Sequence, residues 1–229
     1  MTMKKISILI PAYNEAPVLE KLFARLGNLA NDNKDYDFEF LFINDGSRDK
    51  TLEIIKEYAD KDARVSYINF SRNFGKEIAM IAGLDHVTGD ATVIIDADLQ
   101  DPPELIPQMI KFWEEGYDDV YAKRKSRAGE TWLKKKSAHL YYRILQKTSH
   151  IPIQEDTGDF RLLDRRAVEA LKQFRESERN TKGMFSWIGF NKKEILYNRN
   201  ERAAGSSGWS YFKLINLAVN GITSFTTAP

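Results

Sequence analysis

The stretch ATVIIDADLQDPPE, residues 91–104, predicts a buried strand that runs directly into a cluster of acids. Its first five residues are apolar, small or β-branched, and aspartates and two prolines follow at once. Open α/β sheets bind ligands at the edge where their parallel strands end. The acids should therefore lie at a ligand-binding edge, provided that the rest of the chain supplies such a sheet.

The acids of this stretch have two interpretations, which can hold together. Asp96 and Asp98 flank one small residue, so extended backbone would direct both carboxylates to the same face of the strand. Mg²⁺ or Mn²⁺ commonly binds through one or two such carboxylates plus substrate phosphates. Asp101 could instead cap the next helix, with Pro102 or Pro103 at its first position. We assign metal chemistry to the first two aspartates and capping to Asp101.

Strand and helix patterns alternate upstream of this stretch. Short apolar runs at residues 6–10, 38–43 and 65–70 predict strands, and apolar residues recur at helical spacing after each of them. Strands separated by helices of this length require right-handed crossovers, which produce a mainly parallel sheet covered on both faces. We therefore predict a Rossmann-like α/β fold with a mainly parallel central sheet and helices on both faces.

Polar residues follow each of these predicted strands, at positions 14–15, 44–45 and 72–73. The chain has no Gly-x-Gly-x-x-Gly after its first strand and no Gly-Lys-Ser/Thr phosphate loop. A dinucleotide oxidoreductase and a P-loop enzyme are therefore disfavoured. Phosphates would need another partner, and a metal held by Asp96 and Asp98 is the candidate.

The composition excludes several other classes. The 229 residues carry a net charge of +1, which argues against a nucleic-acid partner. The chain contains no cysteine, so disulfides and thiolate chemistry are ruled out. No run of about 18 or more apolar residues is present, so the sequence predicts no membrane-spanning segment within it.

Four motifs, in the same order along the chain, resemble the family 2 glycosyltransferases of GT-A fold. They are PAYNE at residues 11–15, NDGS at 44–47, DADLQDP at 96–102 and TGDFR at 157–161. The chain is most similar to the polyprenyl-phosphate glycosyltransferases, the group that includes dolichol-phosphate mannose synthase and bactoprenol glucosyltransferases. The resemblance implies an inverting transfer of a sugar from a nucleotide sugar to a lipid phosphate.

The resemblance also implies roles for residues on the donor side. Asp96 and Asp98 would handle the diphosphate through Mg²⁺ or Mn²⁺. The residues that would surround the base and ribose are Pro11, Tyr13, Glu15 and Asp45. Two alternatives stay open: residues 11–15 could only start a helix, with Asn14 as its cap, and residues 45–47 could only form a turn.

The acceptor side is expected further along the chain. Asp159 matches the family's second acidic motif and should lie beside the acceptor, with Asp156 as the second choice. Because a phosphate monoester is largely deprotonated at neutral pH, Asp159 could orient Arg161 or the sugar hydroxyls instead of acting as a base. Arg202 and Ser207 lie in a Gly/Ser-rich segment, which could close over a substrate phosphate or could be a plain linker. We take Asp159, Asp98 and Arg202 as the catalytic candidates, and Arg202, Ser207 and Arg161 as the candidates for contact with a phosphate or the acceptor.

The chain is expected to divide into three parts. Residues 1–125 would form the nucleotide-sugar-binding half, and residues 126–208 the acceptor-side half. The latter includes a basic amphipathic helix at about 131–148, which could lie at a membrane interface or be an ordinary surface helix. Members of the resembled group commonly continue into transmembrane helices after such a segment, so the apolar segment 209–229 is expected to lead into transmembrane helices that this sequence does not contain. The alternative is a C-terminal helix that docks on the catalytic domain.

The resemblance to the polyprenyl-phosphate glycosyltransferases implies an enzyme at the cytoplasmic face of the cell membrane. UDP-glucose is the expected donor and a polyprenyl phosphate the expected acceptor, although GDP-mannose and modified arabinose donors use a similar scaffold. Two other functions remain open. The chain could glycosylate a soluble polysaccharide, or it could bind nucleotide sugars without turnover.

Overall fold

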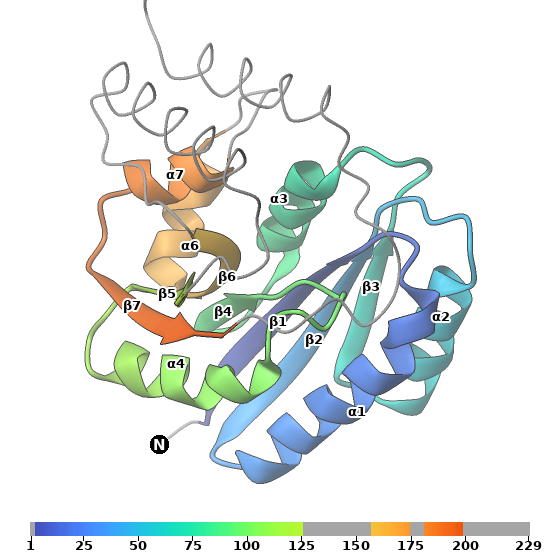
Figure 1. Ribbon diagram of the computed structural model, residues 1–229, viewed down its shortest axis with the longest axis horizontal. Coiled ribbons are helices and arrows are strands. Elements are labelled where there is room, and N and C mark those ends of the chain that lie inside the picture. Colours follow the sequence, from blue (N-terminus) through green and yellow to red (C-terminus); the bar gives the residue numbers. More distant parts are fainter. Residues whose placement is uncertain (1–2, 126–156, 175–180, 199–229) are drawn as a thin grey trace, which may run out of the picture.

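The computed structural model describes residues 3–125, 157–174 and 181–198 of the chain. Strands and helices alternate through most of this part, as Figure 1 shows. The elements are β1 (Lys4–Ala12), α1 (Ala16–Asp32), β2 (Tyr36–Asn44), α2 (Thr51–Lys61), β3 (Val65–Asn69), α3 (Lys76–His86), β4 (Ala91–Ile94), the 3-10 helix η1 (Pro103–Leu105), α4 (Ile106–Glu114), β5 (Asp119–Arg124), β6 (Thr157–Asp164), α6 (Arg165–Lys172), α7 (Thr181–Trp187) and β7 (Lys192–Tyr197).

A seven-stranded sheet forms the centre of the described part, in the order β3-β2-β1-β4-β6-β5-β7. β1 pairs in parallel with β2 and β4, and β3 adds to the parallel set at one edge. β6 runs antiparallel to both of its neighbours, β4 and β5, whereas β7 is parallel to β5. The prediction of a mainly parallel α/β sheet with helices on both faces is confirmed.

Alternate residues of the central strands enter two apolar cores on opposite faces of the sheet. In β1, Ile8 and Ile10 enter the first core and Leu9 enters the second. α1, α2 and α4 supply buried residues to the first core, and α3, α6 and α7 supply them to the second (Figure 1). The central strands are therefore buried on both faces, which explains why the run at 6–10 is apolar throughout.

α1 shows how the sequence places these helices. Its buried residues recur at helical spacing and face the first core, and they are Val18, Leu19, Leu22, Phe23, Leu26, Leu29 and Ala30. Phe23 also stacks on Tyr58 of α2, with ring centroids 3.7 Å apart. The same face thus fixes α1 against both the sheet and its neighbouring helix.

Glu39 links its own strand, β2, to β1 and to the loop that precedes β4. Its carboxylate accepts hydrogen bonds from Thr88 N at 2.7 Å and Thr88 Oγ1 at 2.6 Å, and from the hydroxyl of Ser7. Lys5 Nζ lies 2.6 Å from Glu39 Oε2. Burial works to raise the pKa of Glu39, but the contacts with Lys5, Ser7 and Thr88 outweigh burial and hold this pKa at about 2.

Glu39→Gln should lower the free energy of unfolding at pH 7 by about 2 kcal/mol, because a hydrogen bond to a charged group contributes about 1.5–3 kcal/mol. The folded pKa of Glu39, about 2, lies below its ordinary value of 4.5. The carboxylate's contribution is therefore complete above pH 4.5 and is lost as the pH falls toward about 2. Urea unfolding measures the free energy of unfolding of the unmodified protein and of Glu39→Gln. The difference between these two free energies should be smaller at about pH 3 than at pH 7.

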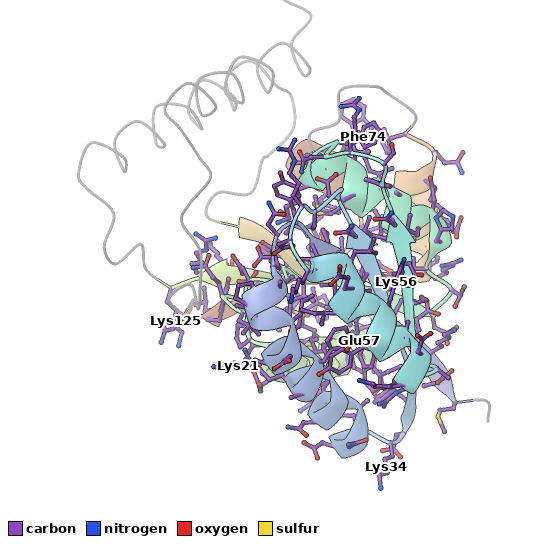
Figure 2. The ribbon with its side chains drawn as sticks, turned by 90° about the vertical axis from the view of Figure 1, so that its right-hand side faces the viewer. Lys21, Lys34, Lys56, Glu57, Phe74 and Lys125 are labelled. Atoms are coloured by element: carbon purple, nitrogen blue, oxygen red, sulfur yellow. The ribbon has the colours of Figure 1, made fainter. Side chains whose placement is uncertain are left out.

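The matched control is Glu57→Gln on the outer side of α2, which Figure 2 shows projecting from that helix. The Glu57 side chain is 68% exposed. Within the part of the chain that the structure describes, its one ion pair is with Lys61, whose Nζ lies 3.8 Å from Glu57 Oε2. This substitution should change the free energy of unfolding far less at either pH. A loss from Glu39→Gln that is equally large at both pH values would contradict the assigned pKa.

Two predictions for the acidic stretch differ from the structure. β4 ends at Ile94 and the chain turns at Ala97 and Asp98, so Asp96 and Asp98 do not lie on one extended strand. The capping role predicted for Asp101 is wrong, because η1 starts from Pro102 without a side-chain cap. Asp101 instead accepts a hydrogen bond from Tyr197 Oη at 2.5 Å, which ties the acidic loop to β7.

Several predictions fall outside the described residues. These are the basic amphipathic helix at 131–148 and the apolar segment 209–229. The division of the chain at residues 125 and 208 also stays a prediction. Among the helices that the structure describes, none has both the length and the apolar character needed to cross a bilayer.

Candidate active site

The loops that follow the parallel strands meet at one edge of the sheet. Asp45 N donates to Ala12 O at 2.9 Å, which joins the ends of β2 and β1. Ile95 N donates to Leu9 O at 3.0 Å, which keeps the end of β4 beside β1. Figure 2 shows Phe74, in the loop after β3, at this end of the molecule and Lys34 at the opposite end. The predicted ligand-binding edge is thus formed by these loops.

The first motif is cross-linked to the loop after β2. Asn14 N donates to Ser47 Oγ at 2.9 Å, and Arg48 N donates to Asn14 Oδ1 at 2.8 Å. Glu15 N donates to Thr51 Oγ1 at 2.9 Å. Asn14 has a φ of 55°, a left-handed conformation that asparagine tolerates better than most residues. Asn14 therefore joins two loops and does not cap α1, whose N-cap is Glu15.

The residues predicted to surround the nucleoside lie in these two adjacent loops. Pro11 is buried near the end of β1, where it pairs in register with Ile43 of β2. Tyr13 is 41% exposed, Glu15 is half-buried and Asp45 is 3% exposed. The structure places these four side chains at one edge of the sheet, and their contact with a nucleotide stays a prediction.

Asp45 holds the loop that connects β3 to α3. Its Oδ1 accepts a hydrogen bond from Phe74 N at 2.7 Å. Its Oδ2 accepts hydrogen bonds from Gly75 N at 2.9 Å and from Asn73 Nδ2 at 2.8 Å. This buried carboxylate therefore fixes the backbone immediately before α3.

The neighbouring Gly46 lies too close to the same loop to carry a side chain. Its φ is +64°, and an added Cβ would lie 2.3 Å from the carbonyl carbon of Arg72 and 2.6 Å from Asn73 N. Gly46→Ala should lower the free energy of unfolding by about 1–3 kcal/mol, the typical cost of a strained backbone conformation. Chemical unfolding measures this loss. Nucleotide binding, measured by calorimetry, should weaken in parallel.

Gly27→Ala is the matched control, because Gly27 lies inside α1 and an added Cβ there would meet nothing within 4 Å. It should raise the free energy of unfolding by about 0.5–1 kcal/mol, since alanine favours a helix over glycine. If Gly46→Ala were as harmless as Gly27→Ala, the close approach of the two loops would be disproved.

The carboxylates predicted for the donor side and the acceptor side lie next to each other. β6 is antiparallel to β4, with Arg161 opposite Ile94, and continuing this register by two residues places Asp159 opposite Asp96. Lys76, the first residue of α3, joins the two carboxylates. Its Nζ lies 2.5 Å from Asp96 Oδ1 and 2.6 Å from Asp159 Oδ2. One ammonium therefore contacts both sides of the candidate active site.

Lys76 lies among three carboxyl groups, those of Asp96, Asp159 and Glu77. Partial burial works to lower the pKa of Lys76, whose side chain is 38% exposed, but the negative charges of Asp159 and Asp96 outweigh it and hold this pKa above its ordinary value. Burial raises the pKa of Glu77, and the nearby Asp159 raises it further. Glu77 Oε2 also accepts a hydrogen bond from Thr181 N at 3.0 Å, which opposes that rise. Lys76 is therefore charged at neutral pH, beside a crowded group of carboxyls.

Asp98 lies in a tight, buried turn. Asp98 is 5% exposed, and its Oδ1 accepts a hydrogen bond from Gln100 N at 3.1 Å. The intervening Leu99 has a φ of 60° and is 4% exposed. A left-handed conformation costs a leucine about 1–3 kcal/mol, so the surrounding packing must hold this turn in place. Strain of this kind is typical of functional loops and supports the importance of this turn.

Asp96 and Asp98 fit the chemistry of a divalent cation. Both supply carboxylate oxygens, and Asp96 already contacts a cation, the ammonium of Lys76. Among the residues that the structure describes, no group of three or more His, Cys, Asp or Glu side chains could hold a metal. Mg²⁺ is usually bound by one or two carboxylates together with substrate phosphates, so a pair is sufficient. Metal binding by this pair stays a prediction.

Arg161 lies inside the molecule and not at the substrate edge. It is 1% exposed, and its Nη1 lies 3.0 Å from Oδ2 of the fully buried Asp119. Its guanidinium also lies 3.8 Å from the centre of the Phe185 ring. The contact with an acceptor phosphate that was predicted for Arg161 has no support from this arrangement, and Arg161 is left out of the site proposed below. Arg202, Ser207 and Asp156 lie outside the described residues.

Sequence reasoning missed Lys76 and Glu77, which lie in the site. One signal could have identified Lys76. Lys76 lies in the first turn of α3, where the helix dipole favours negative charge. A lysine at that position therefore indicates a nearby acidic partner that stabilises it. The acids after β4 and in residues 157–161 could have been that partner.

Comparison with known proteins identifies the family of this chain. The model of the family described as Glycosyl transferase family 2 matches residues 7–172. An uncharacterized glycosyltransferase of Synechocystis sp. is 47% identical over 225 residues, which cover 98% of this chain and 70% of the relative. The bactoprenol glucosyl transferase of Shigella phage SfX is 45% identical over 225 residues, which cover 98% of this chain and 73% of the relative.

A solved structure supports the fold. It is that of glucosyl-3-phosphoglycerate synthase from Mycobacterium tuberculosis in complex with Mn²⁺, UDP and phosphoglyceric acid. The TM-score is 0.69 at 17% sequence identity, and the match covers 99% of this chain and 80% of that one. This likeness confirms the predicted GT-A fold. The extent of the family match, together with the two relatives, shows that the chain belongs to the Glycosyl transferase family 2.

Proposed function

We propose that this chain is an inverting, metal-dependent glucosyltransferase that moves glucose from UDP-glucose to a polyprenyl phosphate at the cytoplasmic face of a membrane. Membership of the family supports the transfer of a sugar. The name of the Shigella phage relative, bactoprenol glucosyl transferase, supports both a glucosyl group and a polyprenyl acceptor.

The contact between Asp96 and Asp159 through Lys76 is the observation that carries this proposal. The donor's diphosphate is expected at Asp96 and Asp98, and the acceptor is expected at Asp159. Because one ammonium spans Asp96 and Asp159, a sugar bound at the first carboxylate would be within reach of an acceptor at the second. Reactants held in such proximity react far faster than reactants that must meet in solution.

The proposed transfer requires little proton chemistry. An oxygen of the acceptor phosphate forms a bond to the anomeric carbon from the side opposite the diphosphate. The bond between the anomeric carbon and the diphosphate breaks, and its electron pair leaves with UDP. The second pKa of a phosphate monoester is about 6, so at neutral pH the attacking oxygen carries no proton. Asp159 therefore acts by positioning the acceptor and not as a base.

The protein's own groups would hold the donor in place. The cross-linked loops at Asn14 and Asp45 provide a rigid edge for the nucleoside. Mg²⁺ or Mn²⁺ held by Asp98 and Asp96 would supply positive charge next to the diphosphate and so favour its departure. The strained turn at Leu99 would keep Asp98 in position before the donor arrives.

The experiment that tests the function uses the protein mixed with vesicles that contain undecaprenyl phosphate. Radiolabelled UDP-glucose and Mn²⁺ or Mg²⁺ are added, and label that extracts into organic solvent is measured. We expect lipid-linked glucose that depends on both the lipid phosphate and the metal. GDP-mannose and other nucleotide sugars serve as competing donors in parallel reactions.

Two results would overturn the proposal in different directions. Label that appears in a soluble polysaccharide, and not in lipid, would identify a different acceptor. Retained binding of UDP without transfer from any nucleotide sugar would identify a binding protein without turnover. Calorimetric titration of UDP in the presence of Mn²⁺ distinguishes this second case from inactive, misfolded protein.

A further inference from the structure

Lys76 raises a question that the proposed function leaves open. The acceptor is a phosphate that carries close to two negative charges at neutral pH, and it must approach Asp159, which is also negative. Asp96 and Glu77 add two more acidic groups to the same place. Like charges repel one another, and they do so more strongly at a partly buried site than in water. The acceptor therefore needs a compensating cation near Asp159.

Lys76 supplies a cation at this position. Its Nζ lies 2.6 Å from Asp159 Oδ2 and 2.5 Å from Asp96 Oδ1. The side chain is 38% exposed, so it lies at the boundary between the protein and solvent, where a substrate could arrive. The Asp159 side chain beneath it is 12% exposed. The ammonium therefore partly cancels the charge of Asp159 while remaining accessible from outside.

The position of Lys76 is fixed by the protein backbone. Gly75 N and Phe74 N, directly before Lys76, donate hydrogen bonds to the two carboxylate oxygens of Asp45. Gly75 has a φ of +99°, a conformation that glycine adopts without strain, and it forms the N-cap of α3. Asp45, which was predicted to contact the nucleoside, therefore also fixes the backbone where the chain enters α3. It thereby fixes the position of Lys76, the first residue of that helix.

We propose that Lys76 is a positioning residue for sugar transfer: it holds Asp159 against the donor-side carboxylate Asp96 and offsets its charge, so that an anionic phosphate acceptor can approach. This inference rests on the proposed function, and it adds a residue that lies outside the four motifs. Lys76 acts through Asp159, and it is not itself needed to bind the nucleotide.

A purely structural ion pair makes different predictions. If Lys76 only stabilised the fold, its removal would lower the thermal stability and would reduce nucleotide binding and transfer together. If Lys76 positions Asp159, its removal should raise the KM for the lipid phosphate and lower kcat, while UDP and Mn²⁺ still bind. Because Lys76 also occupies Asp96, its removal should leave Mn²⁺ affinity unchanged or increased.

The test compares Lys76→Met, which keeps the length of the side chain without its charge, with Lys76→Arg, which keeps the charge. With UDP-glucose saturating and undecaprenyl phosphate varied, we expect Lys76→Met to raise the KM for the lipid about 10-fold and to lower kcat about 100-fold. These changes correspond to the loss of one or two favourable charge contacts. Lys76→Arg should recover at least about 10-fold of the lost kcat/KM.

The matched control is Lys56→Met on α2, labelled in Figure 2, because Lys56 is exposed to solvent. It should leave kcat, KM and nucleotide binding unchanged. Titration of Mn²⁺ with UDP should give Lys76→Met an affinity within about 3-fold of the unmodified protein, or a tighter one. This binding measurement also shows that the variant is folded.

Three outcomes would overturn the inference. These are normal lipid kinetics in Lys76→Met, parallel loss of nucleotide binding and transfer, or a failure of Lys76→Arg to recover any activity. Failure of the proposed function gives a different result, because the unmodified protein would then bind UDP and produce no lipid-linked glucose. That outcome would overturn the proposed function and remove the basis of this inference with it.

Discussion

Asp159→Asn should abolish sugar transfer and leave metal-dependent nucleotide binding intact, whereas Asp98→Asn should abolish that binding. The transfer rate of Asp159→Asn should fall by about 100- to 1,000-fold, as is typical when one positioned charge is removed from an active site. The affinity of Asp98→Asn for UDP in the presence of Mn²⁺ should fall by about 100-fold or more, since removing even an outer partner of a metal costs about 10- to 100-fold.

The different positions of the two carboxylates explain this division of roles. Asp159 belongs to β6 and contacts Lys76, and it is the residue predicted to lie beside the acceptor. Asp98 lies in the strained turn after β4, where Gln100 N donates a hydrogen bond to its Oδ1. Asparagine has nearly the same shape as aspartate, so these substitutions remove charge without creating a cavity. Loss of function then reports on the charge itself.

Asp37→Asn at the exposed amino-terminal end of β2 is the matched control, because it makes the same chemical change at the opposite edge of the sheet. It should leave binding and transfer unchanged. Calorimetric titration gives the affinity for UDP with and without Mn²⁺, and the labelled-lipid reaction gives the rate. Equal loss of nucleotide binding in the Asp98 and Asp159 variants would contradict the division of roles.

Local sequence patterns predicted the parallel half of the fold because its strands are buried on both faces. The runs at 6–10 and 38–43 lie within β1 and β2, and the run at 91–95 covers β4 and the residue that follows it. All three strands contribute side chains to both cores. β6 was not predicted as a strand, because its sequence TGDFRLLD mixes charges with apolar residues. Its place depends on antiparallel pairing with β4, which is distant in the sequence, and no local pattern encodes such pairing.

The candidate site was predicted residue by residue but not as an arrangement. Asp96 and Asp159 were each predicted from a motif, and their proximity follows only from the register of β6 against β4. Asp45 was predicted to contact a nucleoside, whereas its carboxylate accepts hydrogen bonds from the loop before α3. Lys76 stands outside all four motifs, so only the three-dimensional structure connects it with the acids.

Arg161 was predicted to contact a phosphate or the acceptor, but the structure places it inside the molecule. The structure pairs it with Asp119, and both side chains are almost fully buried, at 1% and 0% exposure. Burial raises the pKa of Asp119, and the positive charges of Arg161 and Lys192 counteract that rise. Lys192 Nζ lies 3.9 Å from Asp119 Oδ2, farther than the guanidinium, so Arg161 is the main partner.

Arg161→Met should therefore destabilise the protein without acting specifically on the acceptor. We expect the free energy of unfolding to fall by about 3–5 kcal/mol, the usual cost of leaving one member of a buried ion pair without its partner. In the double variant Asp119→Leu/Arg161→Met both charges are gone. Its loss should be much smaller than that of Arg161→Met, because apolar replacement of a whole buried pair is often close to neutral.

Urea unfolding of the single and double variants measures this coupling directly. The control is Arg166→Met on α6, which removes an arginine that also pairs with aspartates, Asp118 and Asp164, but whose side chain is 72% exposed. Its effect on unfolding should be far smaller, because solvent screens exposed ion pairs. If Arg161→Met unfolded like the Arg166 control and instead raised the KM for the lipid phosphate, Arg161 would be a substrate contact after all. A large loss of stability that the double variant relieves would place the role of Arg161 in the core, where it holds β6 to β5 and so keeps Asp159 opposite Asp96.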